Sequence, residues 1–218
     1  MPETAPFRSS LYPMLSEQPT AGEKLLAELA LAPIEKSRES NRLRELALAE
    51  YEDELLICGR AMADRFARGA TLLAIGNGGS ATGAADFAVE FVSPAPPHRP
   101  LPALSLTNDV AVVTAIANDV SFDDIFLRQI IALGRRGDIV LAVSTSGNST
   151  NIMRALAAAR DRDMLTIGLS GDNGGRMARE GALDHCFTVR ASSIHRIQEV
   201  QTTIAHALWE LVHQQLEN

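Results

Sequence analysis

The chain has 218 residues, of which 46% are hydrophobic and 22% charged, a composition typical of a soluble globular protein with room for one α/β domain. The net charge of −7 argues against nucleic acid as the main partner, and no apolar run is long enough to span a membrane. The cysteines, Cys58 and Cys186, lie in apolar segments without metal-type spacing, and no N-terminal segment has the pattern of a secretory signal. We therefore expect a cytoplasmic protein with buried free thiols.

The N-terminal part of the chain divides into a tail and a helical lead-in. Residues 1–20 are rich in Pro, Ser and Thr and show no periodicity, which predicts a flexible tail or an arm on a neighbouring subunit. We expect residues 21–218 to form a single domain that includes the N-terminal helices.

Two helices are predicted in this lead-in. Residues 22–31 have the composition of a short helix, which Pro33 would end. Between residues 40 and 68 apolar side chains recur mostly at threes and fours, the period of a long helix with one buried face. Ser40 is its candidate N-cap and Gly69 its end.

The stretch 71–93 combines a strand, a glycine turn and a helix. A buried strand is predicted over 72–75, followed by GNGGS at 76–80 and a helix from Ala81. Glycines let the main chain approach a ligand, and free N–H groups at a helix start attract anions. Asp86 and Glu90 lie at i and i+4 on one face of this helix. The segment is either a phosphate cradle with two carboxylates or a tight turn followed by a solvated acidic face.

Strands and helices alternate along the rest of the chain. Further strands are predicted over 103–106, 138–143, 164–169 and 185–189. Helices are predicted over 108–117, 122–133, 151–160, 176–180 and 194–216. This alternation predicts an α/β fold, a doubly wound five-stranded parallel sheet flanked by helices, with the added N-terminal helical segment.

A second polar turn, STSGNS at 144–149, follows the predicted strand 138–143 and precedes another helix. Its hydroxyls and helix-start N–H groups suit a small phosphate monoester. The alternative is an ordinary capping turn in which Ser149 or Thr150 caps the next helix. Because both polar turns end strands of a parallel sheet, where ligands bind, a phosphate-ligand site is favoured.

These motifs carry a resemblance to a known family. GNGGS at 76–80, AIAND at 115–119, STSGNS at 144–149, and RIQE followed by His206 resemble the sugar isomerase (SIS) domain and, within it, the phosphoheptose isomerase group. The resemblance covers roughly residues 40 to 217. It implies the SIS fold and a homotetramer with active sites at subunit contacts.

The resemblance also implies roles for individual residues. Glu90 would be the base that moves a proton between C1 and C2, and His206 the partner acid/base. Residues implied to hold the phosphate are Ser80, Ser144, Ser146 and Ser149. Residues implied to bind the sugar, by side chain or main chain, are Asn77, Gly78, Gly79, Asp119, Thr145 and Gln198. A zinc ion would be held by Asp86, Glu90, Gln198 and His206.

The sequence departs from the family pattern in three places. Asp86 stands where a histidine ligand of zinc is usual, which makes the donor set richer in oxygen. His195 stands where aspartate often precedes RIQE, and it is either a replacement imidazole or a solvated helix residue. An arginine of some members falls at Pro94, and Arg99 would replace it only if the loop bends back.

Other histidines and the tryptophan have structural interpretations. We expect His98 and His213 in solvent, His185 in a structural position, and Trp209 in the core or an interface.

The resemblance implies an aldose-ketose isomerase that converts sedoheptulose 7-phosphate to D-glycero-D-manno-heptose 7-phosphate through an enediol(ate). A carboxylate and an imidazole suit this proton transfer near neutral pH. One alternative is a non-catalytic SIS-domain adaptor of the replication-initiator-associating type, although such adaptors tend to lose the residues at Glu90 and His206. Another is an isomerase or sensor of a different sugar phosphate.

Overall fold

The computed structural model describes residues 19–180 and 183–217, with side chains from residue 33 onward. The chain divides into two compact units, Met1–Arg42 and Leu43–Asn218. The boundary falls within helix α2 (Pro19–Glu50). Most of the predicted tail lies outside the described residues, and the single domain over 21–218 stays a prediction. Within the described ranges, no helix combines the length and apolar character needed to cross a membrane.

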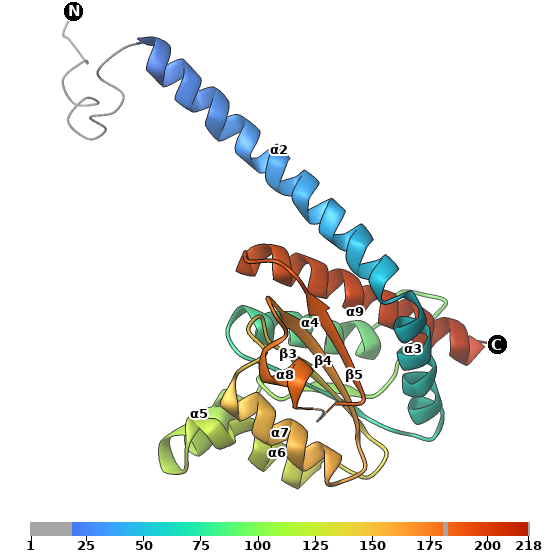
Figure 1. Cartoon of the computed structure of the whole chain (residues 1–218). Coiled ribbons are helices and arrows are strands. Elements are labelled where there is room, and N and C mark those ends of the chain that lie inside the picture. Colours follow the sequence, from blue (N-terminus) through green and yellow to red (C-terminus); the bar gives the residue numbers. More distant parts are fainter. Residues whose placement is uncertain (1–18, 181–182, 218) are drawn as a thin grey trace, which may run out of the picture. The chain divides into compact units, whose positions relative to one another are not determined.

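The second unit is built on a five-stranded parallel sheet, as predicted (Figure 1). Its strands are β1 (Leu72–Gly76), β2 (Ala103–Ser105), β3 (Ile139–Val143), β4 (Leu165–Gly171) and β5 (His185–Val189). Their order is β2-β1-β3-β4-β5, and each neighbouring pair is parallel. The order reverses at β1 and β3, so the carboxyl ends of these two strands form the topological switch point of the sheet.

Helices cover both faces of the sheet (Figure 1). The helices and the short 3-10 turn of this unit are α3 (Glu52–Ala67), α4 (Gly79–Val92), α5 (Val110–Asp119), η2 (Phe122–Asp124), α6 (Ile125–Leu133), α7 (Thr150–Arg160), α8 (Gly175–Arg179) and α9 (Ile194–Glu217). Alternation along the buried strands decides which helices meet which face. On β1, Leu72 packs in the core with α3, α4 and α9, whereas Leu73 packs in the core with α6 and α7.

The N-terminal helices differ from the prediction. The helix predicted over 22–31 does not stop at Pro33, which lies inside α2. An internal proline costs about 3 kcal/mol, and the Ala-, Leu- and Glu-rich neighbours favour helix strongly enough to offset that cost. Ser40 is therefore no N-cap, and its hydroxyl donates to the Lys36 carbonyl one turn earlier.

The helix predicted over 40–68 is interrupted at Tyr51, which separates α2 from α3. The Tyr51 hydroxyl accepts from the Thr188 amide at 3.0 Å, and its ring stands edge-on to Phe187 at 5.3 Å between centroids. These contacts hold Tyr51 against β5, and no local sequence pattern reveals them. Gly69 follows the end of α3 with φ of +86°, as expected for a helix stop.

Two expectations about histidines meet different outcomes. His213 is 1% exposed and stacks on Phe91, so its predicted place in solvent is wrong. His185 is buried and lies 2.6 Å from Glu54, which confirms a structural position. The Cys58 thiol is in the core, where desolvation holds its pKa well above the ordinary value.

Candidate active site

The two polar turns lie at the switch point of the sheet. The glycine turn at 76–80 leaves β1 and enters α4, and the hydroxyl turn at 144–149 leaves β3 and enters α7. Because β1 and β3 are paired in register, Gly76 lies opposite Val143 and the two turns begin side by side. This is the place where open parallel sheets bind ligands.

Hydrogen bonds within the hydroxyl turn and packing against the turn after β4 fix its conformation. The Ser144 hydroxyl accepts from the Gly147 amide at 3.1 Å and lies 3.5 Å from the Ser149 hydroxyl. Gly147 has φ of +62°, and a Cβ there would meet the Gly174 carbonyl oxygen at 2.1 Å. The turn therefore packs main chain to main chain against the turn that follows β4, and only glycine fits at this point.

The start of α7 is open to an anion. Ser149 occupies the N-cap position, but within the described chain its side chain makes no capping hydrogen bond. The capping-turn alternative is thus not what the structure adopts at Ser149. The first turn of α7 follows the hydroxyl turn directly, and helix-start amides together with hydroxyl groups suit phosphate oxygens.

A pair of amides ties the two turns together. Asn77 donates to Asn151 at 3.0 Å, and Asn151 donates back to Asn77 at 2.9 Å. Asn151 is 2% exposed and also accepts from the Ile152 amide. Sequence reasoning missed Asn151, because an asparagine at a helix start has no pattern that points to a partner 74 positions earlier.

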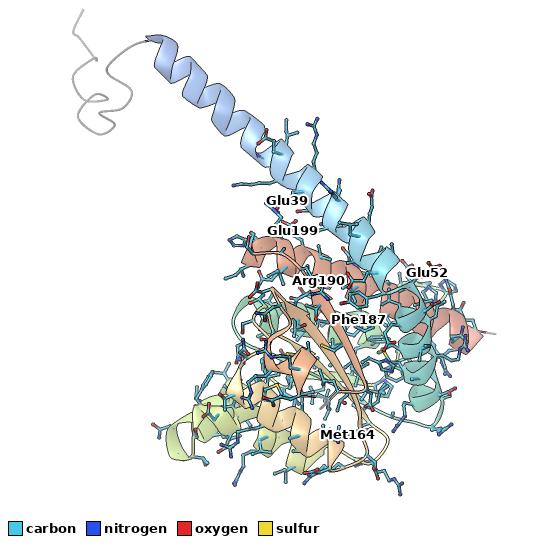
Figure 2. All side chains as sticks on the ribbon, in the orientation of Figure 1. Glu39, Glu52, Met164, Phe187, Arg190 and Glu199 are labelled. Atoms are coloured by element: carbon cyan, nitrogen blue, oxygen red, sulfur yellow. The ribbon has the colours of Figure 1, made fainter. Side chains whose placement is uncertain are left out.

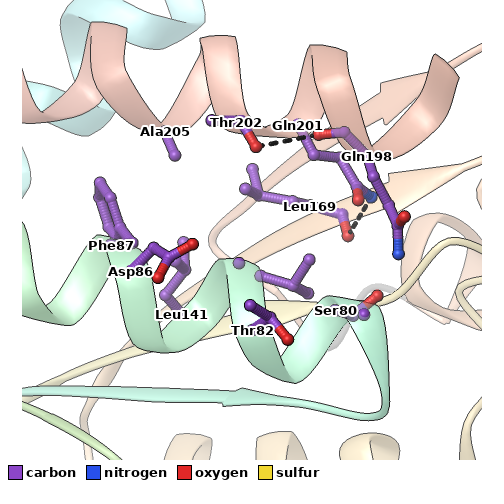
Figure 3. Close-up of a pocket in the computed structure, with 13 residues that line it drawn as sticks. Ser80, Thr82, Asp86, Phe87, Leu141, Leu169, Gln198, Gln201, Thr202 and Ala205 are labelled. Atoms are coloured by element: carbon purple, nitrogen blue, oxygen red, sulfur yellow. Dashed lines mark hydrogen bonds between the residues drawn. The ribbon is translucent and has the colours of Figure 1, made fainter. Parts of the chain in front are cut away.

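A pocket of about 190 Å³ lies between α4 and α9 (Figure 3). Figure 3 shows Asp86 on α4 facing the side of α9 that carries Gln198 and Gln201. A Cβ on Gly79 would meet the Gln198 amide nitrogen at 2.4 Å, so the glycine turn leaves room for this side chain. Gln201 is buried and donates to the Leu169 carbonyl at 3.0 Å. Gln201 was also missed, since a glutamine on the buried face of a helix has no motif of its own.

Glu90 and His206 meet across the same two helices. Oε1 of Glu90 and Nε2 of His206 lie 2.9 Å apart, and their side chains are 36% and 53% exposed. The Trp209 indole N–H donates to the main-chain oxygen of Glu90 at 3.1 Å, which fastens the end of α4 to α9. A carboxylate and an imidazole in hydrogen-bond contact can exchange a proton directly.

Other predicted residues stand apart from this pair. Asp119 ends α5, is exposed and accepts from the neighbouring Asn118 side chain. His195 is exposed in the first turn of α9, and Arg99 is exposed in the loop after α4. None of these three lines the pocket between α4 and α9.

The implied zinc ligands do not assemble in this chain. Asp86 and Gln198 line the pocket, whereas Glu90 and His206 pair with each other outside its lining. Among the described residues, no group of three or more His, Cys, Asp and Glu side chains is placed to hold a metal ion. The donor set therefore does not fit a metal within one described chain, and the zinc ion stays an expectation from the resemblance.

Comparisons with known proteins agree with this architecture. A family model for the SIS domain matches residues 37–171, which include both turns and α4. The phosphoheptose isomerase of Nitratidesulfovibrio vulgaris is 47% identical over 176 residues, covering 80% of this chain and 84% of that protein. The phosphoheptose isomerase of Desulfovibrio desulfuricans is 48% identical over 177 residues, covering 80% and 83%. A solved phosphoheptose isomerase from Neisseria gonorrhoeae matches with a TM-score of 0.77 at 35% identity, covering 87% of this chain and 99% of that chain.

Proposed function

The chain belongs to the phosphoheptose isomerase family of SIS-domain proteins and is a sugar-phosphate isomerase, and on that premise we propose that it converts sedoheptulose 7-phosphate to D-glycero-D-manno-heptose 7-phosphate. The observation that carries the proposal is the 2.9 Å contact between Glu90 and His206. The reaction needs one group for a carbon-bound proton and another for an oxygen-bound proton, and this pair supplies both types.

The proposed chemistry is a proton relay on the open-chain sugar. Glu90 takes a proton from C1 of the ketose while the C2 oxygen gains one from His206, which gives a cis-enediol. His206 then takes the proton of the C1 oxygen, and Glu90 returns its proton to C2. The product is the aldose, and both side chains recover their starting protonation states.

The two turns are proposed to bind the phosphate and orient the sugar. Hydroxyls of Ser80, Ser144, Ser146 and Ser149 would donate to phosphate oxygens, together with main-chain amides at the start of α7. Asn77, Thr145, Gln198 and Asp119 would bind sugar hydroxyls, and the main chain at Gly78 and Gly79 would come close to them. The support is the tie between the turns through Asn151 and the approach of Gln198 to Gly79.

We further propose a homotetramer with active sites at subunit contacts. None of the ten residues of α5, all of them described, is buried, although most are apolar. Val110, Val120 and Phe122 are each more than half exposed in or beside this helix. An exposed apolar surface of this kind is typical of an interface, and a second chain there would bury the helix that ends at Asp119. Light scattering at several concentrations tests the tetramer.

The test of the function is turnover of sedoheptulose 7-phosphate by the purified protein. Glu90→Gln and His206→Ala should each lower kcat by about 10²- to 10⁴-fold, the usual range for loss of a general acid or base. Glu210→Gln removes an exposed carboxylate from α9, the helix that carries His206, and should keep wild-type turnover. Circular dichroism confirms that each variant is folded.

Two results would contradict the proposal. Normal turnover in the Glu90 or His206 variant would remove the acid/base assignment. A wild-type protein that turns over no heptose or hexose phosphate would favour the adaptor function instead. Metal analysis of the purified protein tests the zinc expectation separately, since no step above passes through a metal.

A further inference from the structure

Four arginines line a hollow at the amino-terminal ends of β1, β3 and β4. This is the end of the sheet opposite the two polar turns. The hollow measures about 520 Å³ and includes Arg65 and Arg68 at the end of α3 and Arg135 and Arg136 before β3. Met164, labelled in Figure 2, marks this amino-terminal edge beside the start of β4. The edge is remote from the two polar turns, which follow the carboxyl ends of the strands. The proposed function uses no residue of this hollow.

The hollow is built around Asp163. Its carbonyl oxygen accepts from Arg65 Nη1 at 3.2 Å and from the Gly137 amide at 3.2 Å. Its carboxylate lies 3.3 Å from Nε of Arg136. These contacts join the end of α3, the turn before β3 and the turn before β4, and they place two of the four arginines on one wall; the side chains of the Arg136–Asp163 pair are 85% and 70% exposed.

The second carboxylate of the hollow is also engaged. Asp138 is buried, and its two oxygens accept from the main-chain amides of Thr71 and Arg135, each at 2.8 Å. It therefore locks the turn in place and does not neutralise a guanidinium by direct contact. In the part of the chain that the structure describes, no ion pair engages the guanidinium of Arg68 or of Arg135.

The charged side chains that line the hollow favour an anionic ligand. The lining holds four arginines against two carboxylates, in a chain whose net charge is −7. Guanidinium groups bind phosphate oxygens through paired N–H groups, and a volume of this size falls within the range of about 300–1,000 Å³ for small-molecule sites. A simpler role for the arginines is to offset the negative ends of α3 and α6. That role requires no convergence on one hollow, and it leaves Arg68 and Arg135 without a ligand.

We propose that this hollow binds a phosphorylated small molecule. The guanidinium groups of Arg68 and Arg135 donate hydrogen bonds to its phosphate oxygens. The proposal goes beyond the isomerase function and is independent of it. Arg65 and Arg136 form the wall against which the phosphate is held.

The test is calorimetric titration with inorganic pyrophosphate at about 0.15 M salt, where the interactions of remote surface charges are largely screened. We compare the wild type with Arg68→Gln/Arg135→Gln and with a matched control, Arg128→Gln/Arg179→Gln. The control removes the same charge from exposed positions on α6 and α8. The first variant should bind at least tenfold more weakly at one site, and the control should stay within about twofold of the wild type.

Turnover of sedoheptulose 7-phosphate by the same variants separates this proposal from the proposed function. Both double variants should keep wild-type turnover, because neither changes the switch-point turns. A conservative variant, Arg68→Lys/Arg135→Lys, keeps the charge but loses the planar guanidinium. Its affinity for pyrophosphate should lie between those of the wild type and the Arg68→Gln/Arg135→Gln variant.

Several outcomes would overturn the proposal. Equal pyrophosphate binding in the wild type and the Arg68→Gln/Arg135→Gln variant would mean that all binding occurs elsewhere. Equal loss in the control would reduce the effect to general electrostatics. A lower melting temperature with unchanged binding would assign the arginines to the helix ends. Tight binding of a DNA duplex with no binding of pyrophosphate would replace the small-molecule ligand with nucleic acid.

Discussion

The two turns at the switch point have the same place in the fold but different neighbours. The glycine turn at 76–80 approaches the end of a side chain, because Gly79 faces the Gln198 amide on α9. The hydroxyl turn at 144–149 approaches main chain, because Gly147 faces the Gly174 carbonyl oxygen. A side-chain end can move aside and main chain cannot. The hydroxyl turn is therefore the fixed half of the candidate site and the glycine turn the adjustable half.

The largest expected effect in this comparison is on the fixed half. Gly147→Ala forces a non-glycine residue to φ of +62° and a Cβ to 2.1 Å from main chain. We expect the free energy of unfolding to fall by about 3 kcal/mol, above the 1–2 kcal/mol of the left-handed conformation alone. Urea denaturation measures it. Gly69→Ala is the control, since Gly69 has φ of +86° but no described atom lies within 4 Å of the added Cβ. Equal losses in the two variants would contradict the packing argument.

The next effect concerns the tie between the halves. Asn151→Ala removes two hydrogen bonds to Asn77 and leaves that amide without its buried partner. We expect a loss of about 2 kcal/mol in the free energy of unfolding, together with weaker binding of the sugar phosphate. Asn148→Ala is the comparison for stability, since it also removes two side-chain hydrogen bonds, to the Ser146 carbonyl and from the Arg176 amide, but at an exposed position of the hydroxyl turn. If Asn151→Ala left both stability and KM unchanged, the two turns would be independent.

A substitution in the glycine turn, the adjustable half, should change turnover more than it changes the free energy of unfolding. Gly79→Ala displaces the Gln198 side chain, which is flexible, so the free energy of unfolding should change by less than about 1 kcal/mol. Because Gln198 is proposed to contact the sugar, we expect kcat/KM to fall by about tenfold, equivalent to 1.4 kcal/mol. Steady-state kinetics and thermal melting measure the two quantities. Unchanged kinetics would remove Gln198 from the proposed site.

The smallest effect tests how α9 holds the acid/base pair. Trp209→Phe keeps a large ring but loses the hydrogen bond to the Glu90 carbonyl. We expect a loss of about 1 kcal/mol in stability and a fall of a few-fold in kcat. Tyr51→Phe is the matched control, since its hydroxyl bonds to Thr188 on β5, away from Glu90 and His206. A drop in kcat of the same size in Tyr51→Phe would show that stability alone accounts for the Trp209 result.

The order of the elements was predictable because it depends on local periodicity. Apolar runs of strand length alternate with helical segments, and every predicted strand is present within two residues at each end. The helical lead-in was predicted less well. Pro33 lies within α2, and Tyr51 interrupts what reads as one helix, because its hydroxyl and ring bind β5 from 137 positions away.

The sequence by itself determined the parallel sheet, the two polar turns and the identity of Glu90 and His206 as a candidate pair. The sheet and the turns follow from strand and helix periods and from motifs of adjacent residues, whereas the pair follows from the resemblance to the phosphoheptose isomerase group. Only the tertiary structure decided which groups meet: Glu90 with His206, Asn77 with Asn151, Gly79 with Gln198, and Asp163 with Arg65 and Arg136. Each of these contacts joins residues far apart in the chain, and their distances depend on how helices pack across the sheet.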